Sequence, residues 1–202
     1  MNGEPIFKSI FGDTWQAMPP VMHKHYANRP FSDDSYSCSG PMRVHAACIL
    51  RLFGPLMMLM GGIPITRDDN VPTTVHFNSD SDTNHLHFVR RFHFKGRKPY
   101  IFHSTMVPIR ENIVVEVMKF RLCWCSRFSW QDDRVILAHN GYKLYLFGKF
   151  IPLPISWLVG NIHAEEQAIS DTAFKMFVEI NHPLLGKIYE YHGTFEMDEN
   201  HD

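Results

Sequence analysis

Stretches of alternating or mostly apolar residues, separated by turn-forming residues, follow one another from residue 71 almost to the end of the chain. Ten of these stretches predict β-strands, over residues 71–79, 85–94, 100–107, 113–121, 122–130, 135–138, 142–150, 162–169, 173–180 and 187–196. The connections between them are too short for the crossover helices that parallel strands require, so the pattern favours antiparallel pairing. A series of this length tends to close into a barrel or to fold into two packed layers.

The part of the chain before residue 71 has a different pattern. Residues 6–26 look helical but are interrupted by Pro19 and Pro20, where a helix has to break or restart. A second helix is predicted over about residues 47–60. Residues 28–39 and 79–84 are rich in turn formers and are expected to be flexible.

Together these patterns predict one domain over residues 1–202, which is a usual size for a single core. Its helical part covers about residues 6–62 and its β-rich part about residues 71–196. We expect a mostly antiparallel β-structure, either barrel-like or a two-layer curled sheet, with the N-terminal helices packed on one end or face. The fold counts as α+β if the helices are included.

The most informative strand pattern is that of residues 85–94, because it contains a charge on its apolar face. Alternate side chains of a strand point to opposite faces. One face holds Leu86, Phe88, Arg90, Phe92 and Phe94, and the other holds His85, His87, Val89, Arg91 and His93. Arg90 therefore lies among large apolar side chains, where a guanidinium needs an anion, either an internal carboxylate or a bound ligand.

The same alternation places further polar residues inside. Glu166 shares its face with Ile162, Ala164 and Ala168, and Glu116 shares its face with Val114, Met118 and Phe120. Ser104 lies among Tyr100, Phe102 and Met106, and Tyr191 lies between Tyr189 and Phe195. The interior is therefore predicted to hold Arg90, Glu116, Glu166, Ser104 and one or two tyrosine hydroxyls.

Three interpretations of this interior stay open. The first is a structural network, in which Arg90 pairs with Glu116 or Glu166 and a tyrosine hydroxyl completes the hydrogen bonds. The second is a cavity with apolar walls and a few convergent polar groups, which is typical of a small-molecule site. The third is acid–base catalysis by Glu116 and Glu166, which requires shifted pKa values.

Composition excludes several other classes. A net charge of −1 argues against a nucleic-acid-binding protein, which usually has a strongly basic face. Four cysteines in 202 residues do not make a disulfide framework, so a cytoplasmic setting is expected. The N-terminus does not resemble a signal peptide. The apolar segment 49–65 is short and contains Arg51, glycines and prolines, so no transmembrane segment is predicted.

Sequence motifs for cofactors and metals are absent as well. The sequence has no GxGxxG, Walker or GxSxG motif, so no cofactor is expected. His85 and His87 share a strand face, but no third ligand follows at a suitable spacing, so no metal site is predicted.

The order of several residues along the chain resembles a known family. The matching positions are Trp15, Pro19-Pro20, His25, Gly40, Ile63-Pro64, Phe88-x-Arg90-x-Phe92, Ser104, Glu116, Pro152-Leu153-Pro154, Glu166, His182-Pro183-Leu184-Leu185-Gly186 and Tyr191-x-Gly193. This pattern, from about residue 7 to residue 195, resembles DUF4166, a bacterial domain of unknown function. Phe88 is a departure, because family members commonly have tryptophan there.

The resemblance implies no established activity. Some members of the family are fused behind a saccharopine-dehydrogenase-like NAD(P)-binding domain, whose glycine fingerprint this chain lacks. The resemblance adds His25 to the interior residues, by its position in the pattern only. It makes this chain at most a free-standing counterpart of such a domain, and a reductase supplied in trans is one hypothesis for its partner.

We therefore predict a small-molecule-binding domain that holds an amphipathic or anionic ligand, such as a lipid-like acid. The expected ligand-binding residues are Arg90, Glu116, Glu166, Ser104, Tyr191 and His25, and no catalytic residue is assigned. One alternative is a catalytic or accessory partner of a reductase, with Glu116 and Glu166 as acid–base groups. The other is a structural domain with a buried Arg–Glu network.

Overall fold

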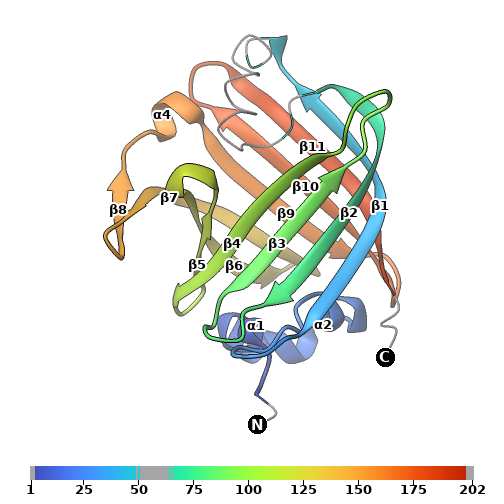
Figure 1. Cartoon of the computed structure of the whole chain (residues 1–202), viewed down its shortest axis with the longest axis vertical. Helices are drawn as coiled ribbons and strands as arrows, with labels where there is room; N and C mark the ends of the chain where they lie inside the picture. The colour runs from blue at the N-terminus through green and yellow to red at the C-terminus, as the bar shows by residue number, and fades with distance from the viewer. Residues whose placement is uncertain (1–2, 49, 51–63, 65, 199–202) are drawn as a thin grey trace.

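The computed structural model describes residues 3–48, 50, 64 and 66–198. The described strands form one antiparallel sheet that closes into a barrel (Figure 1). The strands are β1 (Ser35–Ala46), β2 (Asp68–Ser79), β3 (Leu86–Phe92), β4 (Tyr100–Arg110), β5 (Ile113–Val117), β6 (Leu122–Gln131), β7 (Arg134–Leu146), β8 (Lys149–Leu153), β9 (Asn161–Ala168), β10 (Ala173–His182) and β11 (Gly186–Met197). The predicted mostly antiparallel, barrel-like fold is confirmed.

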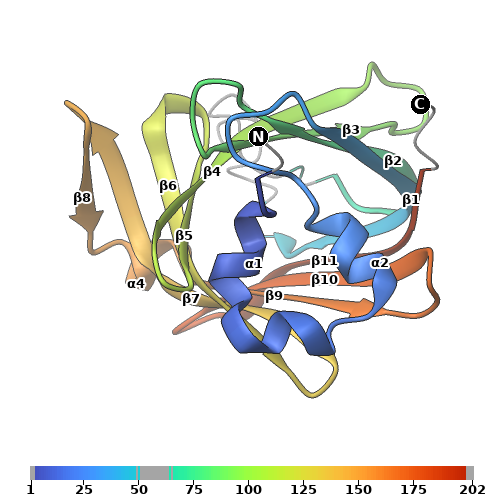
Figure 2. The same ribbon diagram turned by 90° about the horizontal axis from the view of Figure 1, so that it is seen from below.

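The ring consists of ten strands, and β8 lies outside it. Strands β1 to β7 pair in sequence, the first half of β7 then pairs with β9, and β9, β10, β11 and β1 complete the circle. Strand β8 pairs only with the second half of β7, and both extend away from the barrel wall (Figure 2). All the pairings are antiparallel, and because the β6–β7 pairing closes the circle, the ring of described strands has no open edge where another strand could add.

Two glycines lie where the backbones of β1 and β11 leave no room for a side chain. A Cβ atom at Gly40 in β1 would lie 1.9 Å from the carbonyl oxygen of Thr194 in β11. A Cβ atom at Gly193 in β11 would lie 2.6 Å from the carbonyl oxygen of Pro41. Any side chain at either position would push β1 and β11 apart, so this seam of the barrel requires glycine.

The N-terminal helices close one end of the barrel (Figure 2). They are α1 (Ile6–Phe11), the 3-10 helix η1 (Gly12–Ala17) and α2 (Pro20–His25), and we call residues 6–26 the plug. Pro20 begins α2, where a missing backbone N–H costs nothing, so the predicted interruption at the two prolines is confirmed. The rings of Phe7 and Phe128 in β6 lie 5.3 Å apart, so the plug and the barrel share one core.

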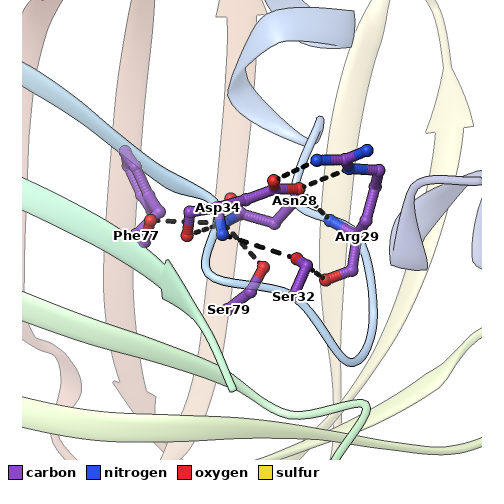
Figure 3. Close-up of polar contacts among 6 residues, drawn as sticks. All are labelled: Asn28, Arg29, Ser32, Asp34, Phe77 and Ser79. Atoms are coloured by element: carbon purple, nitrogen blue, oxygen red, sulfur yellow. Dashed lines mark hydrogen bonds and ion pairs between the residues drawn. The ribbon is translucent and has the colours of Figure 1, made fainter. Parts of the chain in front are cut away.

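A hydrogen-bonded loop over residues 28–34, which we call the clasp, holds the plug against the barrel rim (Figure 3). The buried Asn28 donates through Nδ2 to the carbonyl oxygens of Asp34 and Phe77 and to Ser79 Oγ, each at 3.2 Å. Arg29 donates to both carboxylate oxygens of Asp34, through Nε at 2.9 Å and Nη2 at 2.6 Å. These bonds tie the end of the plug to β2.

Two further short helices are η2 (Lys119–Arg121) and α4 (Ser156–Val159). None of the described helices is long and apolar enough to cross a membrane. The helix predicted over residues 47–60 lies almost entirely outside the described residues.

Three boundary predictions are wrong. Residues 35–39 were expected to be flexible, but they begin β1, because pairing with β2 and β11 outweighs their turn-forming composition. Separate strands were predicted over residues 135–138 and 142–150. Instead, β7 continues through Asn140 and Gly141, and the break between β7 and β8 falls at Phe147 and Gly148. Strand β5 ends at Val117, so Phe120 lies in η2 and is exposed.

Candidate functional site

Arg90 lies at the middle of β3 and points into the barrel, next to polar residues of the two following strands. Its Nη1 donates to Ser104 Oγ in β4 at 2.9 Å and to Glu116 Oε1 in β5 at 3.0 Å. Ser104 Oγ in turn donates to Glu116 Oε1 at 2.6 Å. The internal partner of Arg90 is therefore Glu116, and Ser104 bridges the two charges.

The rest of the Arg90 guanidinium has no protein acceptor. The rings of Phe88 and Phe102 lie 4.9 Å and 5.1 Å from its central carbon, which stabilises the cation. Among the described residues all its hydrogen bonds come from Nη1, so the N–H groups of Nε and Nη2 are left without a partner. Arg90 as a residue is only 8% exposed and borders both interior cavities, so these N–H groups are open to a molecule in the cavities rather than to a protein acceptor.

Glu166 in β9 belongs to a second buried cluster, which joins the barrel to the plug. Tyr26 donates its hydroxyl hydrogen to Glu166 Oε2, and Nε2 of His25 lies 3.2 Å from the same oxygen. Burial raises the pKa of Glu166, but the charge of His25, the hydrogen bonds from His25 and Tyr26 and the charge of Arg90 lower it more, so its pKa falls below the ordinary value. Glu166 is therefore a buried, ionised acceptor for the plug.

Tyr191 in β11 reaches the same interior from the opposite wall. Within the described part of the chain its hydroxyl has no hydrogen-bond partner. Burial raises the pKa of Tyr191 to about 12, while the charge of Arg90 lowers it and the charges of Glu116 and Glu166 raise it. The hydroxyl therefore stays protonated at neutral pH and is available to donate.

Two small cavities lie on either side of Arg90, each with a volume of about 50 Å³. Both are bounded by Arg90, Glu116, Trp124, Val178 and Tyr191. The first also touches the plug and the Glu166 cluster, and the second is otherwise apolar. A cavity of this size admits a few water-sized groups, whereas pockets for drug-sized ligands are about 300–1,000 Å³.

The structure separates the six predicted site residues into three kinds. Arg90, Glu116 and Tyr191 surround both cavities. Glu166 and His25 border one cavity: Glu166 accepts contacts from His25 and Tyr26, and the buried Nδ1 of His25 has no hydrogen-bond partner among the described residues. Ser104 is buried and positions the Arg90–Glu116 pair, but it borders neither cavity.

Sequence reasoning missed Tyr26 and the two rings that flank the guanidinium. Phe88 and Phe102 are recognisable afterwards, because one lies two residues before Arg90 and the other is its register partner in β4. Tyr26 gave no comparable signal, because its partner Glu166 is 140 residues away in the chain. Only the family pattern had pointed to the plug, through His25.

The histidines of the outer face make no metal centre with their neighbours. His87 contacts Asp80 Oδ2 through Nε2 at 3.1 Å and Thr105 Oγ1 through Nδ1 at 3.0 Å. Within the described ranges, no group of three or more histidine, cysteine, aspartate or glutamate side chains could hold a metal ion.

Comparison with known sequences places the chain in a family. Residues 18–195 match the family described as Domain of unknown function (DUF4166). The chain belongs to this family. The match runs from the end of η1 through most of β11, so it includes α2 and every residue of the buried site.

One curated protein similar to this chain is the uncharacterized protein YndH of Bacillus subtilis (strain 168). It is 24% identical over 140 residues, which cover 66% of this chain and 68% of the relative. Neither description gives an activity, so the function has to be argued from the chemistry of the site.

Proposed function

We propose that this DUF4166 protein is a binding domain for a small anionic molecule, whose acidic group lies against Arg90 inside the barrel. The observation that carries the proposal is the single-nitrogen contact between Arg90 and Glu116. A guanidinium that only paired with a carboxylate would use its fork in a bidentate contact. Here Nε and Nη2 have no acceptor among the described residues, so they are available to the oxygens of a bound anion.

The surroundings of Arg90 fit an acidic group better than a neutral one. The Tyr191 hydroxyl is a second free donor at both cavities, and the faces of Phe88 and Phe102 keep the guanidinium desolvated without competing for its N–H groups. Arg90 balances the charge of Glu116, and Ser104 donates a hydrogen bond to the same carboxylate oxygen. An anion of a few heavy atoms matches the cavity volume of about 50 Å³.

A lipid-like acid, with its apolar part inside the barrel, requires more room. Met106 and Met176 line the first cavity and Met118 lines the second. Methionine is the side chain that repacks most easily around a ligand. We therefore expect short-chain carboxylates to bind directly, and longer acids to bind only with displacement of these methionines.

The alternative of a catalytic partner for a reductase has weaker support. A general base works best with a pKa near the operating pH. The pKa of Glu166 is lowered, and its Oε2 already accepts contacts from the plug. Glu166 is thus a weak base that is committed to a structural contact.

Calorimetric titration of the full chain with acetate, butyrate, octanoate and inorganic phosphate tests the proposal. Native mass spectrometry of the purified protein, followed by organic extraction, identifies any acid that is retained. We expect a stoichiometric anion that binds the native chain and is lost in the double variant Arg90→Leu/Glu116→Leu. Removing both charges leaves no stranded partner, so stability stays unchanged or rises by about 1 kcal/mol.

Arg91→Leu is the matched control, because Arg91 is the exposed neighbour on the outer face of the same strand. It should bind the anion as the native chain does. Tyr191→Phe should weaken binding about fivefold, as expected for one lost hydrogen bond. Binding that survives in the double variant, or the absence of binding for all four anions and of any retained acid, would overturn the proposal.

A further inference from the structure

The part of the molecule that leaves the barrel wall has an inner face packed on a core of its own. We call residues 118–122 and 142–160, which contain η2, the second half of β7, β8 and α4, the lobe. Tyr145 and Phe150 of the lobe have ring centroids 4.9 Å apart and pack on the buried outer side chains of β5 and β6. These are Ile113, Val115, Cys123 and Cys125. The lobe is therefore held in place by apolar packing outside the barrel.

The outer side of the lobe is apolar and exposed. Phe147 at the β7–β8 turn is 92% exposed, and Trp157 and Leu158 in α4 are 68% and 60% exposed. Phe120 in η2 is 61% exposed and Ile151 in β8 is 44% exposed. Single exposed apolar residues are ordinary on protein surfaces, but the lobe carries five of the eleven large apolar side chains that are exposed among the described residues, which makes it the candidate interaction surface.

The charges of the lobe have one sign. It carries Lys119, Arg121, Lys143 and Lys149, and no aspartate or glutamate. The rest of the chain has the opposite balance, because the whole protein has a net charge of −1. The lobe is thus a cationic and aromatic element on a slightly acidic protein, and an anionic surface is electrostatically complementary to it.

This combination fits a lipid surface better than a protein partner. Protein interfaces are enriched in aromatic residues but depleted of lysine. Exposed tryptophan, phenylalanine and leucine interspersed with lysine and arginine are the composition of segments that lie at the boundary of headgroups and acyl chains. Strand addition to β8 by a second copy is disfavoured, because Lys149 and Pro152 blunt that edge.

We propose that the lobe docks the protein on an anionic phospholipid bilayer, with Phe147, Trp157 and Leu158 at the headgroup–acyl boundary and the four cations against the headgroups. Docking of this kind is interfacial, and the barrel stays outside the bilayer. The inference is independent of the anion proposed for Arg90, because none of the lobe residues that carry it contacts the guanidinium.

Co-sedimentation of the full chain with phospholipid vesicles measures the proposed docking. Vesicles of phosphatidylcholine alone are compared with vesicles that contain phosphatidylglycerol in addition, at low and high salt. We expect partitioning only onto the anionic vesicles, weakened by salt because the contribution of the cations is screened.

Paired variants assign the binding to the lobe. Lys149→Ala should lower the partition coefficient about fivefold, which corresponds to about 1 kcal/mol for one cation near an anionic surface. Phe147→Ser should lower it roughly tenfold through lost apolar burial. The matched controls are Lys95→Ala, an exposed lysine of the β3–β4 turn, and Phe31→Ser, an aromatic residue of the clasp that is 66% exposed; both should bind as the native chain does.

Tryptophan fluorescence gives a readout that a change in folding would not imitate. Of the four tryptophans, Trp15 and Trp124 are buried, Trp130 is partly buried against the core and Trp157 is exposed, so vesicles should blue-shift the emission mainly through Trp157. In Trp157→Phe the blue shift should disappear while sedimentation with anionic vesicles persists.

Three results would overturn the proposal. They are absence of sedimentation with anionic vesicles, equal loss in the lobe variants and their controls, and binding to both vesicle types that salt does not affect. Concentration-dependent self-association, suppressed by Phe147→Ser in sedimentation velocity without any vesicle binding, would assign the lobe to a second copy of the chain instead.

Discussion

The two buried glutamates of the barrel, Glu116 and Glu166, are held in opposite ways. Glu116 is bonded by Arg90 and Ser104 from neighbouring strands, and the contact leaves part of the guanidinium without an acceptor. Glu166 is bonded by His25 and Tyr26 of the plug, which lies far away in the sequence. The first cluster is local and has unused hydrogen-bonding capacity, whereas the second joins distant segments.

This difference separates a binding role from a structural one. A buried polar contact between remote segments fixes how they pack, and breaking it leaves an uncompensated charge. The backbone ladder through β4 already fixes how β3 and β5 lie, so the Arg90–Glu116 contact is not needed to define their packing. The N–H groups of Arg90 that have no acceptor among the described residues then suggest a function that the fold itself does not require.

The largest loss of stability is expected when Glu166, which accepts the contacts from His25 and Tyr26 of the plug, is removed. Glu166→Ala strands His25 and the Tyr26 hydroxyl, and we expect the free energy of unfolding to fall by about 3–5 kcal/mol. Urea denaturation measures this loss, and limited proteolysis should show earlier cleavage of residues 6–26. The double variant Arg90→Leu/Glu116→Leu, which strands no charge, should leave the plug as resistant to protease as in the native chain. Equal protease sensitivity in the two variants would contradict the distinction.

A smaller effect separates the two tyrosines. Tyr26→Phe removes a hydrogen bond to a buried carboxylate, so we expect it to cost about 1.5–3 kcal/mol of unfolding free energy. Tyr191→Phe removes a hydroxyl that has no partner among the described residues, so its cost should stay within about 0.5 kcal/mol. Thermal and urea unfolding of both variants test this, and a greater loss for Tyr191→Phe would reverse the roles that we assign.

The smallest expected effect is on how stability depends on pH in the acid range. The pKa of Glu166 is lower in the folded chain than its ordinary value of 4.5. The corresponding stabilisation is therefore present above the unfolded-state pKa and is lost as pH falls through the folded-state pKa. Urea midpoints measured between about pH 7 and pH 3 should fall less steeply in Glu166→Gln than in the native chain.

Glu165→Gln provides the control for that measurement. The hydrogen bond from His163 and the contact with Arg134 also lower the pKa of Glu165, but its side chain is 29% exposed and solvent screens it. Its substitution should change the pH dependence less than Glu166→Gln does. The opposite order would mean that the plug contact contributes little to acid sensitivity.

The sequence predicted the barrel and its charged interior because both depend on a two-residue period. Strand alternation alone placed Arg90, Glu116 and Glu166 on buried faces, and all three are buried. The period carries no information about pairing across the barrel, so it left open whether Arg90 meets Glu116 or Glu166. The order of the strands in the ring decides this, because β3, β4 and β5 follow one another and β9 is not beside them.

Other features lacked a local signal. The strand over residues 35–46 is concealed by serines, Gly40 and Pro41, and it is specified by the strands on either side. The hydrogen bond of Tyr26 depends on how the plug docks, which only the assembled core determines. Exposure of Phe147 and Trp157 likewise follows from the departure of β8 from the ring, which alternation does not encode.

The clasp makes the plug comparable to a tethered ligand. Because residues 28–34 join the plug to β1 and are themselves hydrogen-bonded to β2, the plug meets the barrel end at a high effective concentration, on the order of millimolar or above. A separate peptide of residues 3–34 would have to reach that concentration to occupy the same end of a barrel that lacks it. A modest intrinsic affinity between plug and barrel is therefore enough to keep this end closed.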